Sequence, residues 1–376
     1  MAPRRWALLV ATAVISISAV LASPADAARP PASFFGIQAW STPSERGFER
    51  IEQGEIGLYR FGLFWRDVER TPGNYDWSSI DLVVGRAARH GAQLLATLHA
   101  KPAFYGEDFR RVPHTRAQLA AFRRFVRAAV ARYGQGGTFW RAPGQRDLRA
   151  SPIRRWQVWN EVNGSRPECP ASRASGCPTH ATPAEYRRVV GVAAEEIRAG
   201  DSRSQVALAG LAETRRGQPV ISYLRALYRD RNFQKRFDAV SLHPYAVEPE
   251  AVLFAVRRAR AVTRSAGDGR APIWVTEVGW GTGGSAFNST SPRGQAKLLR
   301  RTFDLLVGAR RRYRIAVVAW FCFQDRPSHS DDQPGSAFPS AGLFDRQGRP
   351  KPAWKAYVAI TGGRTGGRVP AYSNGG

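Results

Sequence analysis

Short apolar runs and longer amphipathic stretches alternate along the whole chain. The apolar runs are rich in Val, Ile, Leu and Ala on both faces, which is typical of strands buried in a parallel sheet. We expect eight such strands, at Phe34–Gln38, Ile56–Gly62, Gln93–His99, Ile153–Asn160, Gln205–Gly210, Phe237–His243, Ile273–Gly279 and Ile315–Phe321. Apolar residues at helical spacing predict helices between them, most clearly at Arg116–Tyr133, Pro183–Ala199, Pro219–Arg229, Pro249–Ser265 and Ser291–Arg312.

This alternation predicts βα units with parallel strands. Eight units, closed by a last helical stretch at Lys351–Ile360, fit an α/β fold of the (β/α)8 or TIM-barrel type. The length of 376 residues and the 43% hydrophobic fraction agree with one large core. No linker-like tract separates the strands, so we expect a single domain over residues 28–361 and a flexible, glycine-rich tail over residues 362–376.

The first residues are typical of an export signal. Arg4 and Arg5 give a basic start, residues 6–22 are apolar or small, and Ala25-Asp26-Ala27 matches a small-x-small cleavage site. We expect residues 1–27 to be removed and the mature protein to be secreted, outside the membrane. An uncleaved membrane anchor is the alternative, because an apolar run of 17 residues reaches the lower limit for a spanning helix.

The three cysteines agree with export. Cys169 and Cys177 flank a short loop rich in Pro, Ser and Gly, which favours a local disulfide in an oxidising compartment. A zinc site formed with His180 is the alternative, although two thiols and one imidazole at this spacing are a weak signature. Cys322 lies in an apolar run and is expected to be a free, buried thiol.

Neither a metal nor a cofactor is expected. The glycine-rich stretch over residues 279–284 follows a strand, but it lacks the spacing of a nucleotide-binding fingerprint. The chain has only six histidines, and none of them has the paired spacing of a metal site.

The net charge of +26 has the sign expected for a nucleic-acid-binding protein, but the distribution of the basic residues along the chain argues against nucleic-acid binding. Only five of the 56 basic residues are lysine, and the basic residues are spread along the chain instead of clustering around aromatic side chains. Runs such as Arg310-Arg311-Arg312 lie where outer helices of a barrel expose a solvated face. We therefore expect no specific nucleic-acid partner, and a monomer.

Two short segments, Trp159-Asn160-Glu161 and Val275-Thr276-Glu277, each place a glutamate at the end of a predicted strand, the fourth and the seventh. The two glutamates are 116 residues apart in the sequence. In a (β/α)8 barrel all strands deliver their C-terminal ends to one face. Two carboxylates on that face suit acid/base and nucleophilic chemistry at a glycosidic bond. A separation of roughly 5 Å would indicate a retaining mechanism.

Other strands also end in polar or aromatic side chains that packing alone does not explain. Any single one can cap a strand or belong to the core, but together they indicate an active site. They are Arg60, His99, His243 with Tyr245, and Trp320.

At these residues the chain resembles the clan A glycoside hydrolases, which are retaining (β/α)8 enzymes with Asn-Glu on strand four and a second Glu on strand seven. The resemblance also covers residues 241–245, 276–280 and 342–345, and among clan members it is closest to family 39 and to cellulase-like family 5. The chain departs from the pattern at Val162, where many relatives have Pro.

The resemblance implies a role for each residue. Glu161 would be the general acid/base, Glu277 the nucleophile that forms a covalent glycosyl-enzyme, and Asn160 a hydrogen-bond partner of the sugar 2-hydroxyl. Tyr245 and Arg60 would hold Glu277 ionised. His99 and His243 would line the innermost sugar subsite. Flat apolar faces for sugar rings would come from Trp320, Trp280 and Trp65.

The sequence therefore predicts a secreted retaining glycoside hydrolase that acts on a polysaccharide or an oligosaccharide. A transglycosylase that remodels extracellular glycans is one alternative, since the same two glutamates would serve it. A non-catalytic carbohydrate-binding barrel is another, although such a module has no chemical need for the pair.

Overall fold

The computed structural model describes residues 29–145, 147–166, 177–213, 217–328 and 336–373. Residues 31–376 form one compact unit that holds every described helix and strand, and residues 1–30 form a second unit of which only residues 29 and 30 are described. The expected signal at residues 1–27 and Cys169 lie outside the described residues. Cleavage after Ala27 and the Cys169–Cys177 disulfide therefore stay predictions.

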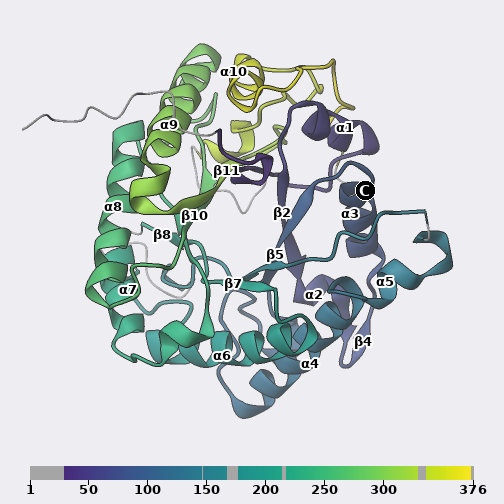
Figure 1. Cartoon of the computed structure of the whole chain (residues 1–376), viewed down its shortest axis with the longest axis vertical. Helices are drawn as coiled ribbons and strands as arrows, with labels where there is room; N and C mark the ends of the chain where they lie inside the picture. Colours follow the sequence, from purple (N-terminus) through teal and green to yellow (C-terminus); the bar gives the residue numbers. More distant parts are fainter. Residues whose placement is uncertain (1–28, 146, 167–176, 214–216, 329–335, 374–376) are drawn as a thin grey trace, which may run out of the picture. The chain divides into compact units, whose positions relative to one another are not determined.

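Parallel strands form a barrel in the middle of the larger unit (Figure 1). Its sheet has the order β7-β6-β5-β2-β1-β11-β10-β9-β8. The strands are β1 (Phe35–Gln38), β2 (Leu58–Phe64), β5 (Gln93–His99), β6 (Arg155–Val158), β7 (Gln205–Ala207), β8 (Leu211–Ala212), β9 (Val240–His243), β10 (Ile273–Val278) and β11 (Ile315–Phe321).

The sheet closes on itself through the fifth barrel position. β7 and β8 stand at opposite ends of the sheet order, yet only residues 208–210 separate them along the chain. β7 pairs with β6, β8 pairs with β9, and Ala207 forms a parallel bridge with Ala239 just before β9. The two short strands are thus halves of one barrel strand, and the predicted (β/α)8 fold is confirmed.

Helices surround the strands (Figure 1). The main ones are α1 (Glu45–Gln53), α3 (Ser78–Arg89), α4 (Arg116–Tyr133), α6 (Pro183–Gly200), α7 (Val220–Tyr228), α8 (Pro249–Ser265), α9 (Pro292–Tyr313) and α10 (Pro352–Thr361). α4 and α6 begin with complete capping boxes, and proline occupies the first turn of α6, α8, α9 and α10, where its missing N–H costs nothing. Among the described residues, none of the helices combines the length and hydropathy needed to cross a membrane.

Smaller elements complete the loops. They are the helices α2 (Trp65–Val68) and α5 (Thr138–Arg141), the antiparallel hairpin β3 (Glu69–Thr71) and β4 (Asn74–Tyr75), and the 3-10 turns η2 (Ala32–Phe34), η3 (Ala103–Tyr105), η4 (Pro143–Gln145), η5 (Phe233–Arg236) and η6 (Phe338–Ser340).

The alternation of side chains along each strand separates two cores. Between the strands and the helices lies the large core, which includes Phe122, Trp159 and Trp320. A small cluster of inward-facing residues fills the barrel itself: Leu58, Leu95, Ala207, Ala239, Trp274 and Val317. This plug closes the interior, so chemistry is confined to the strand ends.

The expected flexible tail is described up to residue 373 and contains no helix or strand in that part. Several of its backbone groups bond to the barrel unit. Gly367 accepts a hydrogen bond from Arg50 at 3.1 Å, and the Val369 N–H donates to Gly348 at 3.0 Å.

Candidate active site

A cleft of about 440 Å³ opens at the C-terminal ends of the strands. Its size lies within the range of ligand pockets in enzymes. Its lining comes from seven strands and the loops that follow them: Gln38, Trp40, Arg60, Gly62, Phe64, Thr97, His99, Arg110, Asn160, Glu161, Gly164, His180, Tyr245, Glu277, Phe321, Ser336 and Phe338. Both predicted glutamates thus face one cleft.

Glu161 follows β6 at a turn that non-glycine residues rarely adopt. Trp159 and Glu161 have φ values of 68° and 46°, a left-handed conformation that costs of order 1–3 kcal/mol and persists where packing enforces it. The Trp159 indole is fully buried and donates from Nε1 to the Arg110 carbonyl at 2.7 Å, while its backbone N–H donates to Leu98 at 2.8 Å. These contacts fix the turn that carries Glu161 into the cleft.

Glu277 lies at the end of β10 and is held on both oxygens. Arg60 Nη1 donates to Oε1 at 2.5 Å, and the Tyr245 hydroxyl donates to Oε2 at 2.7 Å. The Arg60 side chain is 2% exposed and that of Glu277 10%, so this ion pair is almost free of water. Hydrogen bonds to a charged carboxylate favour its ionised form.

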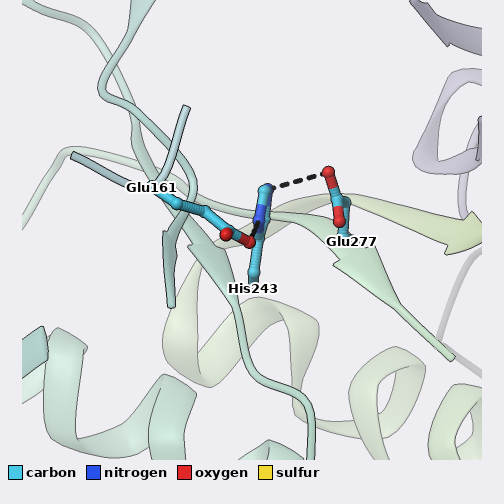
Figure 2. Close-up of side chains that lie close together, drawn as sticks. All are labelled: Glu161, His243 and Glu277. Carbon is cyan, nitrogen blue, oxygen red and sulfur yellow. Dashed lines mark hydrogen bonds and ion pairs between the residues drawn. The ribbon is translucent and has the colours of Figure 1, made fainter. Parts of the chain in front are cut away.

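His243, at the end of β9, lies between the two carboxylates (Figure 2). Its Nδ1 is 2.7 Å from Glu161 Oε1, and its Nε2 is 3.1 Å from the Thr276 hydroxyl and 3.6 Å from Glu277 Oε1. One oxygen from each carboxylate and one imidazole nitrogen all lie within 4.8 Å of one another. The imidazole therefore fixes the distance between the two carboxylates.

The surroundings of Glu277 set its charge. Burial raises the pKa of Glu277, but its charge interactions with His243 and Arg60 and the hydrogen bonds from Arg60 and Tyr245 outweigh that effect. The pKa of Glu277 therefore lies below its usual value. Tyr245 changes in the opposite direction, because burial and the adjacent Glu277 charge raise the pKa of its phenol.

Arg60 also organises the neighbouring amides. It donates to Gln38 Oε1, to Gln157 Oε1 at 3.3 Å, and from Nη2 to Asn160 Oδ1 at 2.8 Å. Gln157 in turn donates to Asn160 Oδ1 at 3.4 Å. The Asn160 oxygen is thus engaged on the protein side, which leaves its amide N–H groups for a ligand.

His99, at the end of β5, is neutral in the folded protein. Burial and then the charges of Arg60, Arg66 and Arg110 lower the pKa of His99 to about 3. Its ring stacks on Trp159 at a centroid distance of 5.4 Å, and its Nδ1 is buried with no hydrogen-bond partner among the described residues. His99 lines the cleft, and its contact with a sugar stays a prediction.

Four expected contact residues lie outside the cleft lining. His243, Trp320 and Trp65 are completely buried, Trp280 is 1% exposed, and Trp65 packs against both Phe122 and Phe125. These side chains are not accessible to a ligand in the cleft, so the expectation that they contact sugar rings needs correction. His243 instead contacts both carboxylates and holds them in position.

Trp320 is buried away from the cleft because of the register of β11. Val317 belongs to the cluster inside the barrel, so residues 319 and 321 share its inward face, whereas Trp320 points outward and packs against Trp280. Phe321 accordingly lines the cleft in the place expected for Trp320.

Several lining residues were not predicted from the sequence. Gln38 carried a signal, since it is a polar residue at the end of an apolar strand. Gln157, inside the fourth predicted strand, carried the same signal, but it is buried behind the cleft lining and accepts a hydrogen bond from Arg60. Trp40, Arg110, His180 and Phe338 come from loops, where no periodicity marks them.

Glu161, His243 and Glu277 form the one group of possible metal ligands among the described residues. Their atoms already have protein partners: both imidazole nitrogens are within hydrogen-bond distance of protein oxygens, and Arg60 and Tyr245 bind the oxygens of Glu277. The group is therefore better described as a carboxylate pair with a supporting imidazole.

Cys322 is a free, buried cysteine, as predicted. Cys177 is also buried, but Cys169 lies outside the described residues.

The fold is shared with known glycoside hydrolases. A family 39 glycoside hydrolase from the gut symbiont Bacteroides cellulosilyticus superimposes with a TM-score of 0.63 at 18% identity, covering 88% of this chain and 64% of that one. A family 5 protein from Bifidobacterium longum, in complex with Manβ1-4GlcNAc, gives a TM-score of 0.62 at 14% identity, covering 87% and 78%. A monomeric β-xylosidase from Caulobacter crescentus gives 0.59 at 18% identity, covering 89% and 69%.

The structural neighbours are thus clan A glycoside hydrolases of families 39 and 5, in agreement with the resemblance at the strand ends. This chain spans less than two thirds of the length of the Bacteroides protein. No protein-family model matches its sequence, and no curated protein does either.

Proposed function

We propose that the protein is a retaining glycoside hydrolase that cleaves O-glycosidic bonds of a polysaccharide or oligosaccharide by double displacement. The observation that carries this proposal is the approach of the Glu161 and Glu277 carboxylates to within 4.8 Å in one cleft. Retaining enzymes keep their carboxyl groups about 5–5.5 Å apart, whereas inverting enzymes need about 6.5–9.5 Å to admit a water molecule.

The different environments of the two glutamates assign their roles. Glu277 is buried, paired with Arg60 and held by Tyr245, which suits a nucleophile that must be ionised and aimed at the anomeric carbon. The Glu161 side chain is 39% exposed and has His243 as its side-chain partner, so it can exchange protons with water between the two steps.

In the first step Glu161 protonates the departing glycosidic oxygen while Glu277 bonds to the anomeric carbon. In the second step Glu161 removes a proton from water, which attacks the same carbon and releases Glu277. Asn160 directs its amide N–H groups at a hydroxyl beside the anomeric centre, because Arg60 and Gln157 occupy its oxygen. Phe64 and Trp40, which line the cleft and are exposed, supply apolar surface for sugar rings.

We further propose that the enzyme acts outside the cell, after removal of residues 1–27. The basic start, the apolar run and the Ala25-Asp26-Ala27 site support export.

A panel of aryl glycosides with different sugars tests the proposal. We expect the wild-type protein to release the aryl alcohol from at least one sugar, and Glu277→Gln, which keeps the size of the side chain, to lose that release. Equal release by both proteins would show that the carboxylate of Glu277 does not take part.

A further inference from the structure

A second cavity lies at the opposite end of the barrel from the active site. Its volume is about 580 Å³, which is in the range of ligand pockets. It is built where β5, β6 and β7 begin, and its lining includes Gln93, the first residue of β5. His99, the last residue of β5, lines the active-site cleft, and six strand steps separate the two residues by about 20 Å. The two cavities are therefore separate sites.

Four arginines line this cavity, and no Asp or Glu does. They are Arg149, Arg154, Arg155 and Arg203. By contrast, the active-site cleft contains two glutamates that balance its arginines. The second cavity therefore has a strong excess of positive charge.

Neighbouring acidic groups do not neutralise it. Asp201 contacts two of the arginines at once, Arg154 at 3.2 Å and Arg203 at 3.6 Å. Arg149 and Arg155 have no ion-pair partner among the described residues. One carboxylate thus contacts two of the four guanidinium groups, and the other two have no counter-charge among the described residues.

The arginines are also held close to one another. Arg154 and Arg203 both donate from Nη2 to the same oxygen, Gln135 Oε1, at 2.6 and 2.9 Å. Like charges in such proximity repel each other, and the repulsion is stronger where water is partly excluded. Arg155 is partly buried and donates from Nη1 to a neutral amide oxygen, Gln93 Oε1, at 2.6 Å. An anion in the cavity would relieve both the repulsion and the missing counter-charge.

We propose that this cavity binds an oxyanion that carries several negative charges, with the chemistry of linked phosphate groups. Guanidinium groups bind phosphate oxygens through two parallel hydrogen bonds, which makes arginine well suited to such ligands. The cavity has room for more than one charged group, and four guanidinium groups match more than one phosphate. The proposal does not depend on hydrolase activity, because the cavity and the cleft share no residue.

Isothermal titration of the full-length protein with pyrophosphate, at a fixed ionic strength set with sodium chloride, tests the proposal. We expect saturable binding to one site. The double variant Arg149→Gln with Arg155→Gln should bind at least about tenfold more weakly, because each lost charge-assisted hydrogen bond contributes more than 1.4 kcal/mol. The double variant Arg225→Gln with Arg257→Gln removes the same charge from exposed sites on α7 and α8 and should bind like the wild type.

Arg155 bridges β5 and β6, so folding of each variant is checked by circular dichroism. Arg149 is exposed and has no polar partner among the described residues, so Arg149→Gln alone removes no hydrogen bond or ion pair of the fold and should still weaken binding. Heat changes that do not saturate would overturn the proposal. Equal affinity in the cavity variant and in the surface control would also overturn it, since binding would then reflect the overall charge of +26.

Discussion

At the residue scale, the hydrogen bond from Tyr245 to Glu277 has two consequences for the proposed chemistry. It orients the carboxylate and, with Arg60, lowers its pKa. Glu161 has neither partner and is more exposed, so the two glutamates differ in freedom as well as in position. Single substitutions can separate these effects.

Tyr245→Phe keeps the ring and removes only the hydroxyl. We expect kcat/KM to fall by roughly 10- to 100-fold, the value of one hydrogen bond to a charged group. The loss of a bond that favours the ionised carboxylate raises the pKa of Glu277, so the acidic limb of the pH profile of kcat/KM should move to higher pH. A loss of rate with an unmoved limb would indicate that Tyr245 acts on packing alone.

His99→Gln should reduce the pH dependence of stability between about pH 6.5 and pH 3. The folded protein keeps His99 neutral down to a pKa of about 3, whereas the unfolded chain binds a proton below about pH 6.5. The unfolded state therefore binds more protons in this window, and the free energy of unfolding falls with decreasing pH by up to about 1.4 kcal/mol per pH unit. Urea unfolding at pH 7.0, 5.5 and 4.5 measures this slope. Identical slopes in the variant and the wild type would contradict a neutral, buried His99.

At the element scale, the break between β7 and β8 makes room for His243. A Cβ at Gly210 would overlap the imidazole of His243, whose position depends on Glu161 and Thr276. Gly210 also pairs with Asn160 through a parallel bridge. The break in the fifth strand is thus part of the active site.

Gly210→Ala should therefore displace His243 and lower kcat/KM by at least about tenfold, the value of a single hydrogen bond to a charged group. Gly308→Ala is the matched control, because nothing lies within 4 Å of a Cβ at that helical position in α9. It should keep full activity and gain up to about 1 kcal/mol of stability. The steady-state kcat/KM of the two variants tests this prediction, and equal values would exclude a steric role for Gly210.

The elements themselves were largely predictable from the sequence, because hydrophobic periodicity marks them. α4, α8, β5 and β11 begin and end at the predicted residues, and most other elements differ by a few residues. The register of a strand was not predictable where both faces are apolar: in Ile315–Phe321 nothing distinguishes the face of Trp320 from that of Phe321. The break at residues 208–210 was missed for a similar reason, since Gln205–Gly210 is uniformly apolar after its first residue.

The candidate site was predictable where a strand end carries it and unpredictable where a loop does. Glu161, Glu277 and Arg60 were found because parallel strands bring their C-terminal ends together. Arg110 and His180 reach the same cleft from loops whose course depends on tertiary contacts, such as the hydrogen bond from the Trp159 indole to the Arg110 carbonyl.

At the scale of the whole molecule, the proposed export and the proposed reaction of the two carboxylates lead to separate predictions. If the protein is exported, the mature chain begins at Ala28 and contains the Cys169–Cys177 disulfide. Mass spectrometry of the secreted protein should show the loss of residues 1–27, with these two thiols resistant to alkylation until a reductant is added. Alkylation of both thiols without reductant would contradict the disulfide.

The central claim is that Glu277 forms a covalent bond to the sugar while Glu161 handles the proton. In Glu161→Ala, an aryl glycoside with a good leaving group still reacts with Glu277, because the leaving group needs no protonation, but no base remains to activate water. The glycosyl-enzyme should therefore accumulate. Intact-mass analysis of this variant after mixing with an activated substrate, followed by peptide mapping, is the most direct measurement. We expect the mass of one sugar residue attached to Glu277; a sugar attached elsewhere, or no adduct together with inverted product from the wild type, would contradict the account.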